Sequence, residues 1–349
     1  MRNYAGIQAL RGVAALSVAF GHILINRPLA GISAPVAAKL QLILQSGVDL
    51  FFVISGFIIA MSATELAEKM GRQAAGEFAI RRFARIYPLY WVVLLLAVAT
   101  SYWVPPGPPW FSDKLGIEHF TLATTQNFFV PVAWTLCFEV CFYLATTFSI
   151  IIAPRHVIAL SAAGACVTGL ILSNTIALEF AFGIGIAVLV RRNFERPSPL
   201  VCAIGAAILV SVGAWFCLHD GAISNEARTA TFGAGSALLL YAIVTIEMRG
   251  AKFSQLLCYA GDISYSVYVW HVLILTWIRP VGPRAPEIYK AFFELANLVP
   301  GLLPALLLLF IMAFSAVSFV CIERPALRLV RALRANPSDG GLHRRVRTT

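Results

Sequence analysis

The sequence predicts an all-α membrane protein, a polytopic bundle of about ten transmembrane helices with both termini in the cytoplasm. Of its 349 residues, 59% are hydrophobic and 13% are charged, whereas a soluble globular domain carries about 25% charged residues. The mean hydropathy is +0.79. A soluble core cannot bury so many apolar side chains, so most of them must face lipid or other embedded helices.

Ten segments have the length and composition of membrane-spanning helices, although the sixth is short. A span needs about 20 largely apolar residues. We expect the helices at 6–26, 42–62, 86–104, 133–152, 156–174, 176–190, 199–218, 229–247, 263–279 and 301–322. The first segment has no cleavage pattern of a signal peptide and is expected to be retained. Residues 1–334 then form one membrane domain, and the polar, basic residues 335–349 are expected to be a disordered cytoplasmic tail.

The positive charges lie between the apolar segments. With both termini in the cytoplasm, the cytoplasmic side holds 19 of the 27 Lys and Arg residues, as the positive-inside rule requires. The formal net charge of +10 therefore indicates topology signals and contacts with anionic lipid rather than nucleic-acid binding. The seven cysteines lie in apolar stretches without CxxC or zinc-ligand spacing, which predicts buried thiols and no metal site.

The first expected helix carries two ionisable residues, Arg11 and His22. They are eleven residues apart, close to three helical turns, so they share one face about 16 Å apart along the axis. Taken alone, Arg11 could be an anchor that reaches the interface and His22 a packing histidine. Their shared face favours a functional role, because ionisable groups inside a membrane are costly.

Four ionisable residues are expected at a similar depth in the outer half of the membrane: His22, Asp49, Glu139 and His271. Two imidazoles and two carboxylates at one depth suggest acid–base chemistry or a proton path. The sequence predicts their depth only and does not show whether they face one another.

A basic run, Arg81, Arg82 and Arg85, leads into the third expected span from the cytoplasm. It could simply be a positive flank of that span. Arginine also matches phosphate with its fork of donors. Because Arg82 and Arg85 are three residues apart on one helix face, they are candidates for holding a phosphorylated cofactor.

Six motifs, in order from residue 7 to 325, resemble the acyltransferase 3 family of bacterial membrane acyltransferases, which O-acylate surface and exported carbohydrates. They are Ile7–Ala15 followed by His22, Gly47–Phe57, Arg81–Pro88, Trp134–Tyr143, Ser264–His271 and Glu323–Pro325. The opening and the size look most like exopolysaccharide O-acetyltransferases. Cys137 and Cys141 depart from the polar residues that the family often carries around its glutamate.

The resemblance implies that His22 is the catalytic histidine. It would act as a general base towards a sugar hydroxyl, or carry the acyl group as a covalent adduct. Glu139 or Asp49 would orient and stabilise its imidazole. Acetyl-CoA would be the donor, with no metal involved. Arg82 and Arg85 would hold its phosphates, assisted by Arg81, and Arg11 would line the path of its pantetheine arm.

The remaining expectations concern the acceptor side. Trp134, Tyr143 and His271 would contact substrate or support the site, and Glu323 would cap a helix or pair with a nearby arginine. The acceptor would be a carbohydrate, lipid-linked in one version of the hypothesis, and proteins of polysaccharide biosynthesis would be candidate partners besides membrane lipids. Nucleic acid is not expected as a partner. The location would be the bacterial cytoplasmic (inner) membrane, crossed several times.

Other classes of function remain open from the sequence. An intramembrane set of His, Asp and Glu would also suit a proton-coupled transporter or flippase of a lipid-linked glycan. That class commonly shows inverted repeats, which we do not find here. The enzyme could also act on a lipid, a peptide or another small molecule. A catalytically silent scaffold is disfavoured by the buried charges.

Overall fold

The computed structural model describes residues 4–26, 32–103, 115–127, 129–192, 197–278 and 301–334. Throughout these ranges the regular structure is helical, with no β-strand. The fold class predicted from hydropathy, an all-α membrane bundle, is therefore confirmed. The expected tail, residues 335–349, lies outside the described residues.

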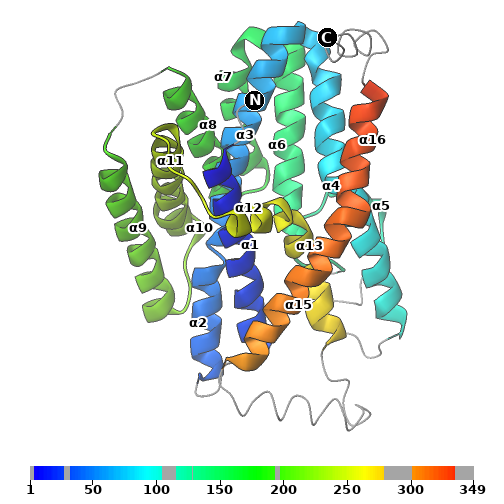
Figure 1. The fold of residues 1–349 in the computed structure, drawn as a ribbon, viewed down its shortest axis with the longest axis vertical. Helices are drawn as coiled ribbons and strands as arrows, with labels where there is room; N and C mark the ends of the chain where they lie inside the picture. The colour runs from blue at the N-terminus through cyan, green and yellow to red at the C-terminus, as the bar shows by residue number, and fades with distance from the viewer. Residues whose placement is uncertain are drawn as a thin grey trace, which may run out of the picture.

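The helices follow the order of the expected apolar segments (Figure 1). The principal ones are α1 (Ala5–Asn26), α2 (Ala34–Leu44), α3 (Gly47–Met70), α4 (Ala74–Trp103), α5 (Ile117–Thr121), α6 (Ala133–Ile152), α7 (Val157–Ile171), α8 (Leu178–Arg191), α9 (Pro199–Asp220), α10 (Asn225–Arg228), α11 (Ala234–Met248), α12 (Gln255–Asp262), α13 (Ser264–Trp277), α15 (Leu302–Ser318) and α16 (Arg324–Arg334). Two π-helical segments, Thr229–Gly233 and Phe319–Glu323, precede α11 and α16.

Seven helical stretches in the described part of the chain are long and apolar enough to cross a membrane. They are Ala5–Asn26, Ala34–Ser101, Ala133–Ile152, Pro154–Ile171, Pro199–Asp220, Asn225–Met248 and Leu302–Val330. The second stretch contains α3 and α4, which turn back on each other at Gly71–Gln73. α8 and α13 have 14 residues each, about 21 Å of helix against a hydrocarbon core of about 30 Å. Ten crossings with cytoplasmic termini remain a prediction.

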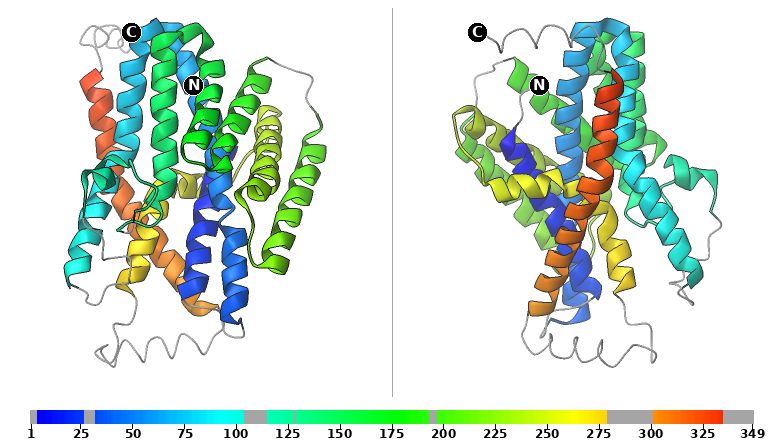
Figure 2. Two further views of the ribbon diagram at one scale, coloured as in Figure 1. Left: turned by 180° about the vertical axis from the view of Figure 1, so that it is seen from behind. Right: turned by 45° about the vertical axis from the view of Figure 1, so that its right-hand side comes forward.

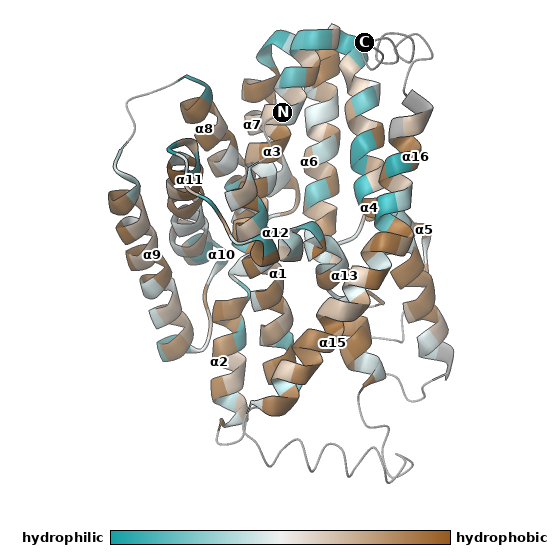
Figure 3. Ribbon diagram, viewed as in Figure 1, coloured by the Kyte–Doolittle hydropathy of each residue, from teal (hydrophilic) through white to brown (hydrophobic). Residues whose placement is uncertain are grey.

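The bundle is elongated, and most helices run along its long axis (Figures 1 and 2). α1 begins and α16 ends in the upper half of the view in Figure 1. Hydrophilic residues gather at that end, over the turn between α3 and α4 and along α16, whereas the lower ends of α2 and α15 are apolar (Figure 3). This asymmetry gives the bundle one charged end.

Helix α4 begins twelve residues before the expected span at 86–104. Hydropathy detects only the apolar part of a helix, and here the helix continues into a polar extension. The basic run Arg81, Arg82 and Arg85 therefore lies within α4 rather than before it. Likewise, the expected span at 42–62 is divided between α2 and α3, and α3 extends to Met70.

Close helix contacts are made at glycines. On α3, a Cβ at Gly56 would collide with the carbonyl of Phe180, and on α8 a Cβ at Gly183 would collide with the carbonyl of Val53. α1 and α12 meet similarly, because Gly12 lies against the Leu257 carbonyl. Small residues let helix backbones approach in a membrane, and here they fix the lateral position of α3 and α1.

α12 crosses the bundle beside α1, at mid-height (Figure 1). α13 starts directly after it and runs toward the lower end (Figure 2). The first turn of α13 thus lies inside the protein, where Ser264 and Ser266 are fully buried. This arrangement brings the N-terminus of α13, whose first N–H groups have no acceptor within their own helix, to the middle of the bundle.

Gly183→Val should destabilise the bundle, because the new side chain would meet the backbone of α3, which cannot move aside as a side chain can. Overpacking of this kind costs about 1–3 kcal/mol. Thermal unfolding of the detergent-purified protein measures the loss. Gly185→Val, two residues away on α8, is the control, since a Cβ at Gly185 has nothing within 4 Å. An equal fall in Tm for both variants would contradict the packing role of Gly183.

Candidate functional site

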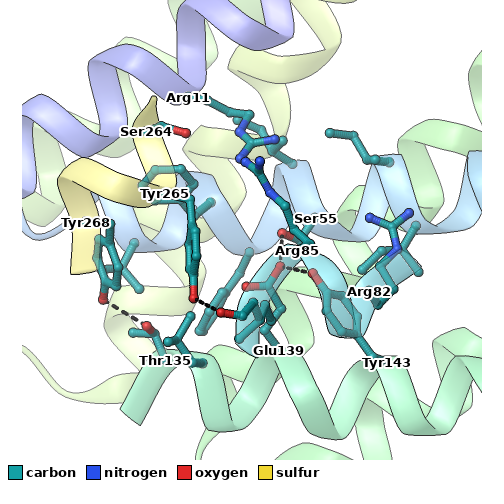
Figure 4. Close-up of a pocket in the computed structure, with 18 residues that line it drawn as sticks. Arg11, Ser55, Arg82, Arg85, Thr135, Glu139, Tyr143, Ser264, Tyr265 and Tyr268 are labelled. Atoms are coloured by element: carbon teal, nitrogen blue, oxygen red, sulfur yellow. Dashed lines mark hydrogen bonds between the residues drawn. The ribbon is translucent and has the colours of Figure 1, made fainter. Parts of the chain in front are cut away.

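A pocket of about 750 Å³, its open mouth included, lies between α1, α3, α4, α6 and α13 (Figure 4). Its polar lining residues are Arg11, Ser55, Arg82, Arg85, Thr135, Glu139, Tyr143, Ser264, Tyr265 and Tyr268. The rest of the wall is aliphatic and aromatic, contributed mainly by α3. A concave apolar site with a few converging polar groups is the usual form of a small-molecule site.

Three of the four arginines expected to bind a cofactor line this pocket: Arg11, Arg82 and Arg85. Arg81 does not. It pairs with Glu77 one turn earlier, at 2.5 Å between Nε and Oε1, and its side chain is 59% exposed. Successive helix positions point in different directions, so the basic run is divided between the pocket and the surface.

The arginines of α4 are held in different ways. Arg82 donates to the hydroxyl of Ser62 at 2.6 Å, and its guanidinium lies over the ring of Tyr143, 5.6 Å from the centroid. Arg85 pairs with Glu323 at 3.3 Å between Nη1 and Oε2. The expectation that Glu323 pairs with an arginine is confirmed by this contact.

The Nε of Arg11 is buried and has no hydrogen-bond partner among the residues that the structure describes, and the same holds for the Nε of Arg82. The buried hydroxyl of Ser264, which also lines the pocket, has none either. Figure 4 shows Arg11, from α1, and Ser264, from the first turn of α13, among the residues that line the pocket. Buried polar groups without a partner are rare and call for an explanation.

Glu323 joins three elements behind the pocket. Its carboxylate accepts from the hydroxyl of Ser266, in the first turn of α13, and from Arg85 of α4. A carboxylate near a helix N-terminus interacts favourably with the helix dipole. Glu323 therefore links the first turn of α13 to α4 from a distant part of the chain and fixes Arg85 beside it.

Glu139 projects into the same pocket from α6. Its Oε1 accepts from the hydroxyls of Tyr143, at 2.5 Å, and Ser55, at 3.2 Å. Glu139 is thus hydrogen-bonded to α3 and to its own helix, in the pocket that the arginines also line. Tyr143 lines the pocket as well. Trp134, which precedes Glu139 by five residues, packs edge-to-face on Phe138 with ring centroids 5.8 Å apart and lies outside the pocket lining.

His22 and His271 meet each other, 249 residues apart in the sequence. His271 Nε2 lies 3.3 Å from His22 Nδ1, and the ring centroids are 4.9 Å apart. His271 is fully buried and His22 is half-buried. The pair adjoins the pocket through Tyr268, a pocket residue whose ring centroid lies 5.9 Å from that of His271.

Asp49 takes part in a different cluster. It forms a bidentate ion pair with Arg228, with nitrogen–oxygen distances of 2.7 to 3.1 Å, and Arg228 also donates to the carbonyl of Gln45. The carboxyl of Glu179, fully buried on α8, lies beside this pair. The four residues expected at one depth therefore occupy three places: the histidine pair, the Glu139 site and the Asp49 cluster.

Residues 4–322 match a known protein family described as an acyltransferase domain. The chain belongs to the acyltransferase 3 family. It is 28% identical over 327 residues to the exopolysaccharide production protein ExoZ of Rhizobium meliloti (strain 1021), covering 85% of this chain and 93% of that protein. It is 24% identical over 304 residues to the peptidoglycan O-acetyltransferase OatA of Listeria monocytogenes, covering 72% of this chain and 48% of OatA. No solved structure matches it.

Several pocket and cluster residues of this acyltransferase escaped the sequence reasoning. Glu179 lies inside the expected span 176–190 and satisfies the same criterion that singled out Asp49, so a complete survey of intramembrane charges would have found it. Arg228 lies just before the expected span 229–247, whereas in the structure it belongs to α10, within the candidate span Asn225–Met248. Ser55, Ser264 and Tyr268 lie inside the motifs Gly47–Phe57 and Ser264–His271, but they carry no charge, and no spacing rule separates them from the packing residues of those motifs.

Arg228→Met should destabilise the protein strongly, because it leaves the fully buried Asp49 without its counter-charge. Removing one partner of a buried pair costs about 3–5 kcal/mol. Thermal unfolding measures the loss. Arg191→Met is the control: Arg191 pairs with Glu68 at 2.6 Å, but at an exposed site, where a pair is worth about 0–1 kcal/mol. Similar stability of the two variants would show that the Asp49 pair is not important for folding.

Proposed function

We propose that this acyltransferase moves an acyl group, acetyl in the natural reaction, from acyl-CoA to a hydroxyl of a cell-surface or exported carbohydrate. The observation that carries the proposal is the pocket in which Arg11, Arg82 and Arg85 converge, joined through Tyr268 to the pair of His22 and His271. One end suits an anionic donor, and the other offers a nitrogen base.

The charge of the pocket supports a phosphorylated donor. Three guanidinium groups line the pocket or its wall, against the carboxylates of Glu139 and Glu323. The excess is positive, and the unpaired Nε of Arg11 and hydroxyl of Ser264 are free to donate. Arginine binds phosphate with charge-assisted hydrogen bonds. The phosphates of CoA would satisfy these donors.

The apolar part of the pocket suits the uncharged remainder of the donor. Phe51, Phe52 and Ile58 of α3 line it, and Arg11 and His22 lie on one face of α1, about 16 Å apart along its axis. The pantetheine arm would extend along this face, past Tyr268, and bring its thioester to His22. The distance between Arg11 and His22 then reflects the length of the donor.

His22 is the proposed general base. Its Nε2 would remove the proton of the acceptor hydroxyl as the hydroxyl oxygen attacks the thioester carbon. The carbon–sulfur bond then breaks, and the thiolate of CoA takes the proton from His22, which returns the imidazole to its neutral form. Positioned proton transfer of this kind contributes about 10²–10⁴-fold to rate.

The relatives support a carbohydrate acceptor, since one is named for exopolysaccharide production and the other for O-acetylation of peptidoglycan. The acceptor would be a sugar hydroxyl, on a lipid-linked or exported glycan, delivered by proteins of polysaccharide biosynthesis. The multi-pass bundle would reside in the bacterial cytoplasmic membrane. Family membership favours this reaction over a transporter or flippase, for which the arginines of the pocket have no evident use.

Arg11→Met should weaken binding of CoA without unfolding the protein, because the buried Nε of Arg11 has no hydrogen-bond partner among the described residues that the substitution would leave unpaired. A lost charge-assisted contact of about 1.5–3 kcal/mol corresponds to roughly a 10- to 150-fold weaker Kd. Calorimetric titration of the purified protein with CoA measures it. Arg85→Ala is a less clean test, since it leaves Glu323 unpaired.

Arg81→Met serves as the control for charge, because Arg81 lies in the same basic run but outside the pocket. Its Kd for CoA should stay within about threefold of the wild-type value. Equal weakening by both substitutions would indicate a general charge effect instead of a donor site in the pocket.

His22→Ala should abolish acyl transfer while CoA still binds, because the donor phosphates are held at the other end of the pocket. Transfer of radiolabelled acetyl groups from acetyl-CoA to glycan in membranes that contain the variant measures the first effect, and the CoA titration measures the second. Transfer at a rate near that of the wild type would show that His22 is not the base.

A further inference from the structure

The two histidines face two backbone carbonyls as well as each other. His22 Nδ1 lies 3.0 Å from the carbonyl oxygen of Val18, one turn earlier on α1. His271 Nδ1 lies 3.2 Å from the carbonyl oxygen of Val267, one turn earlier on α13. A carbonyl oxygen can only accept a hydrogen bond. Each Nδ1 must therefore carry a proton for its contact to be favourable.

This assignment determines the hydrogen bond between the rings. In a neutral imidazole, a proton on Nδ1 leaves Nε2 as an acceptor. His271 Nε2 is then an acceptor, and it faces the Nδ1–H of His22 at 3.3 Å. The Nδ1–H of His22 is thus shared between two acceptors, the carbonyl oxygen of Val18 and Nε2 of His271. Both acceptors contact Nδ1, so neither occupies Nε2 of His22.

The opposite arrangement is unfavourable at two points. If His271 donated from Nε2 to His22 Nδ1, the neutral forms of both rings would present an Nδ1 lone pair to a carbonyl oxygen, at Val18 and at Val267. Two acceptors would face each other at both contacts. The cost is high for His271, which is fully buried and cannot be solvated by water.

From this geometry we infer that His271 is a positioning residue for His22: its Nε2 accepts from Nδ1–H of His22, fixes the ring orientation and leaves Nε2 of His22 as the free basic nitrogen. The inference deepens the proposed function and rests on it for its catalytic meaning. In this site a second imidazole occupies the place beside the base that a carboxylate occupies in a triad.

The carboxylates are held elsewhere. Asp49 is engaged by Arg228, and Glu139 accepts from Tyr143 and Ser55. A neutral acceptor has a chemical consequence. When His22 takes up a proton at Nε2, its Nδ1–H becomes a charged donor, and the hydrogen bond to His271 strengthens. The pair thus supports the imidazolium form without placing a second charge in the apolar interior.

Three substitutions of His271 separate positioning from simple packing. His271→Gln places an amide oxygen near the former Nε2 and keeps an acceptor for His22. His271→Asn places its amide near the former Nδ1 and keeps only the contact to Val267. His271→Leu removes both. We expect kcat within about tenfold of wild type for Gln, and about a hundredfold lower for Asn and Leu, within the usual contribution of a general base.

KM for acetyl-CoA should change little in all three variants, since the arginines of the pocket are untouched. Equal losses for the Gln and Leu variants, or near wild-type kcat for the Leu variant, would overturn the role of His271. An increase in KM with unchanged kcat would also overturn this role, because it would indicate that His271 contacts the substrate.

The tautomer itself can be measured without any activity. In the wild-type protein labelled with ¹⁵N-histidine, solid-state NMR at neutral pH should show His22 with a protonated Nδ1 and an unprotonated Nε2, assigned by comparison with His22→Ala. In His271→Leu, the signal of the other tautomer should increase. Observation of His22 protonated at Nε2 in the wild type would overturn the inference.

This readout is independent of the proposed reaction. If acetyl-CoA proved not to be the donor, or if His22→Ala retained transfer, the proposed function would fail while the spectrum still decided the arrangement of the pair. If the reaction is correct and the spectrum shows the opposite tautomer, only the positioning role of His271 fails.

Discussion

A charge buried among apolar helices must have a partner within hydrogen-bond reach, and the structure of this acyltransferase depends on that constraint. Asp49 is matched by Arg228, and Glu323 by Arg85. Glu247 accepts from the first two backbone N–H groups of α1, at 2.7 and 2.8 Å. Each contact joins helices that are far apart in the sequence. Lipid tails are as apolar as the helix surfaces, so the hydrophobic effect hardly favours one helix pair over another. These polar contacts therefore determine which helices meet.

At the candidate site, some buried polar groups have no hydrogen-bond partner among the described residues. The Nε of Arg11 and the hydroxyl of Ser264 are buried, and no described residue satisfies either of them. They adjoin an apolar pocket, and through Tyr268 the pocket adjoins a half-buried histidine that is oriented by a buried one. A long anionic thioester would need hydrogen-bond donors without a partner, and Arg11 and Ser264 offer them at one end. A sugar hydroxyl would need a free basic nitrogen, and His22 offers one at the other end. Because α12 crosses the bundle and α13 starts at mid-height, the site lies inside the bundle rather than at its surface.

Part of the site was predictable because its residues carry charge at unusual positions. Arg11, Arg82, Arg85 and Glu139 were selected as ionisable groups in or beside apolar segments, and all four line one pocket. The depth estimate brought His22 and His271 to the same level, where the structure joins them. It could not show that the carboxylates lie in other clusters, because depth is one coordinate and helix rotation is another. Arg81 shows the same limit, since a difference of one position on a helix turns the side chain by about 100° and takes Arg81 out of the pocket.

The sequence by itself determined the fold class, the family and the residues able to do chemistry, because hydropathy, motif order and intramembrane charge are properties of the chain alone. Only the tertiary structure decided which of these residues meet. The backbone contact of Gly56 with Phe180 and that of Gly12 with Leu257 set the lateral position of α3 and α1, and no periodicity in the sequence encodes such a contact. Asp49 of α3 was therefore a plausible partner of His22, but the structure places it against Arg228 of α10. His271 took that place because α13 starts in the middle of the bundle and runs beside α1.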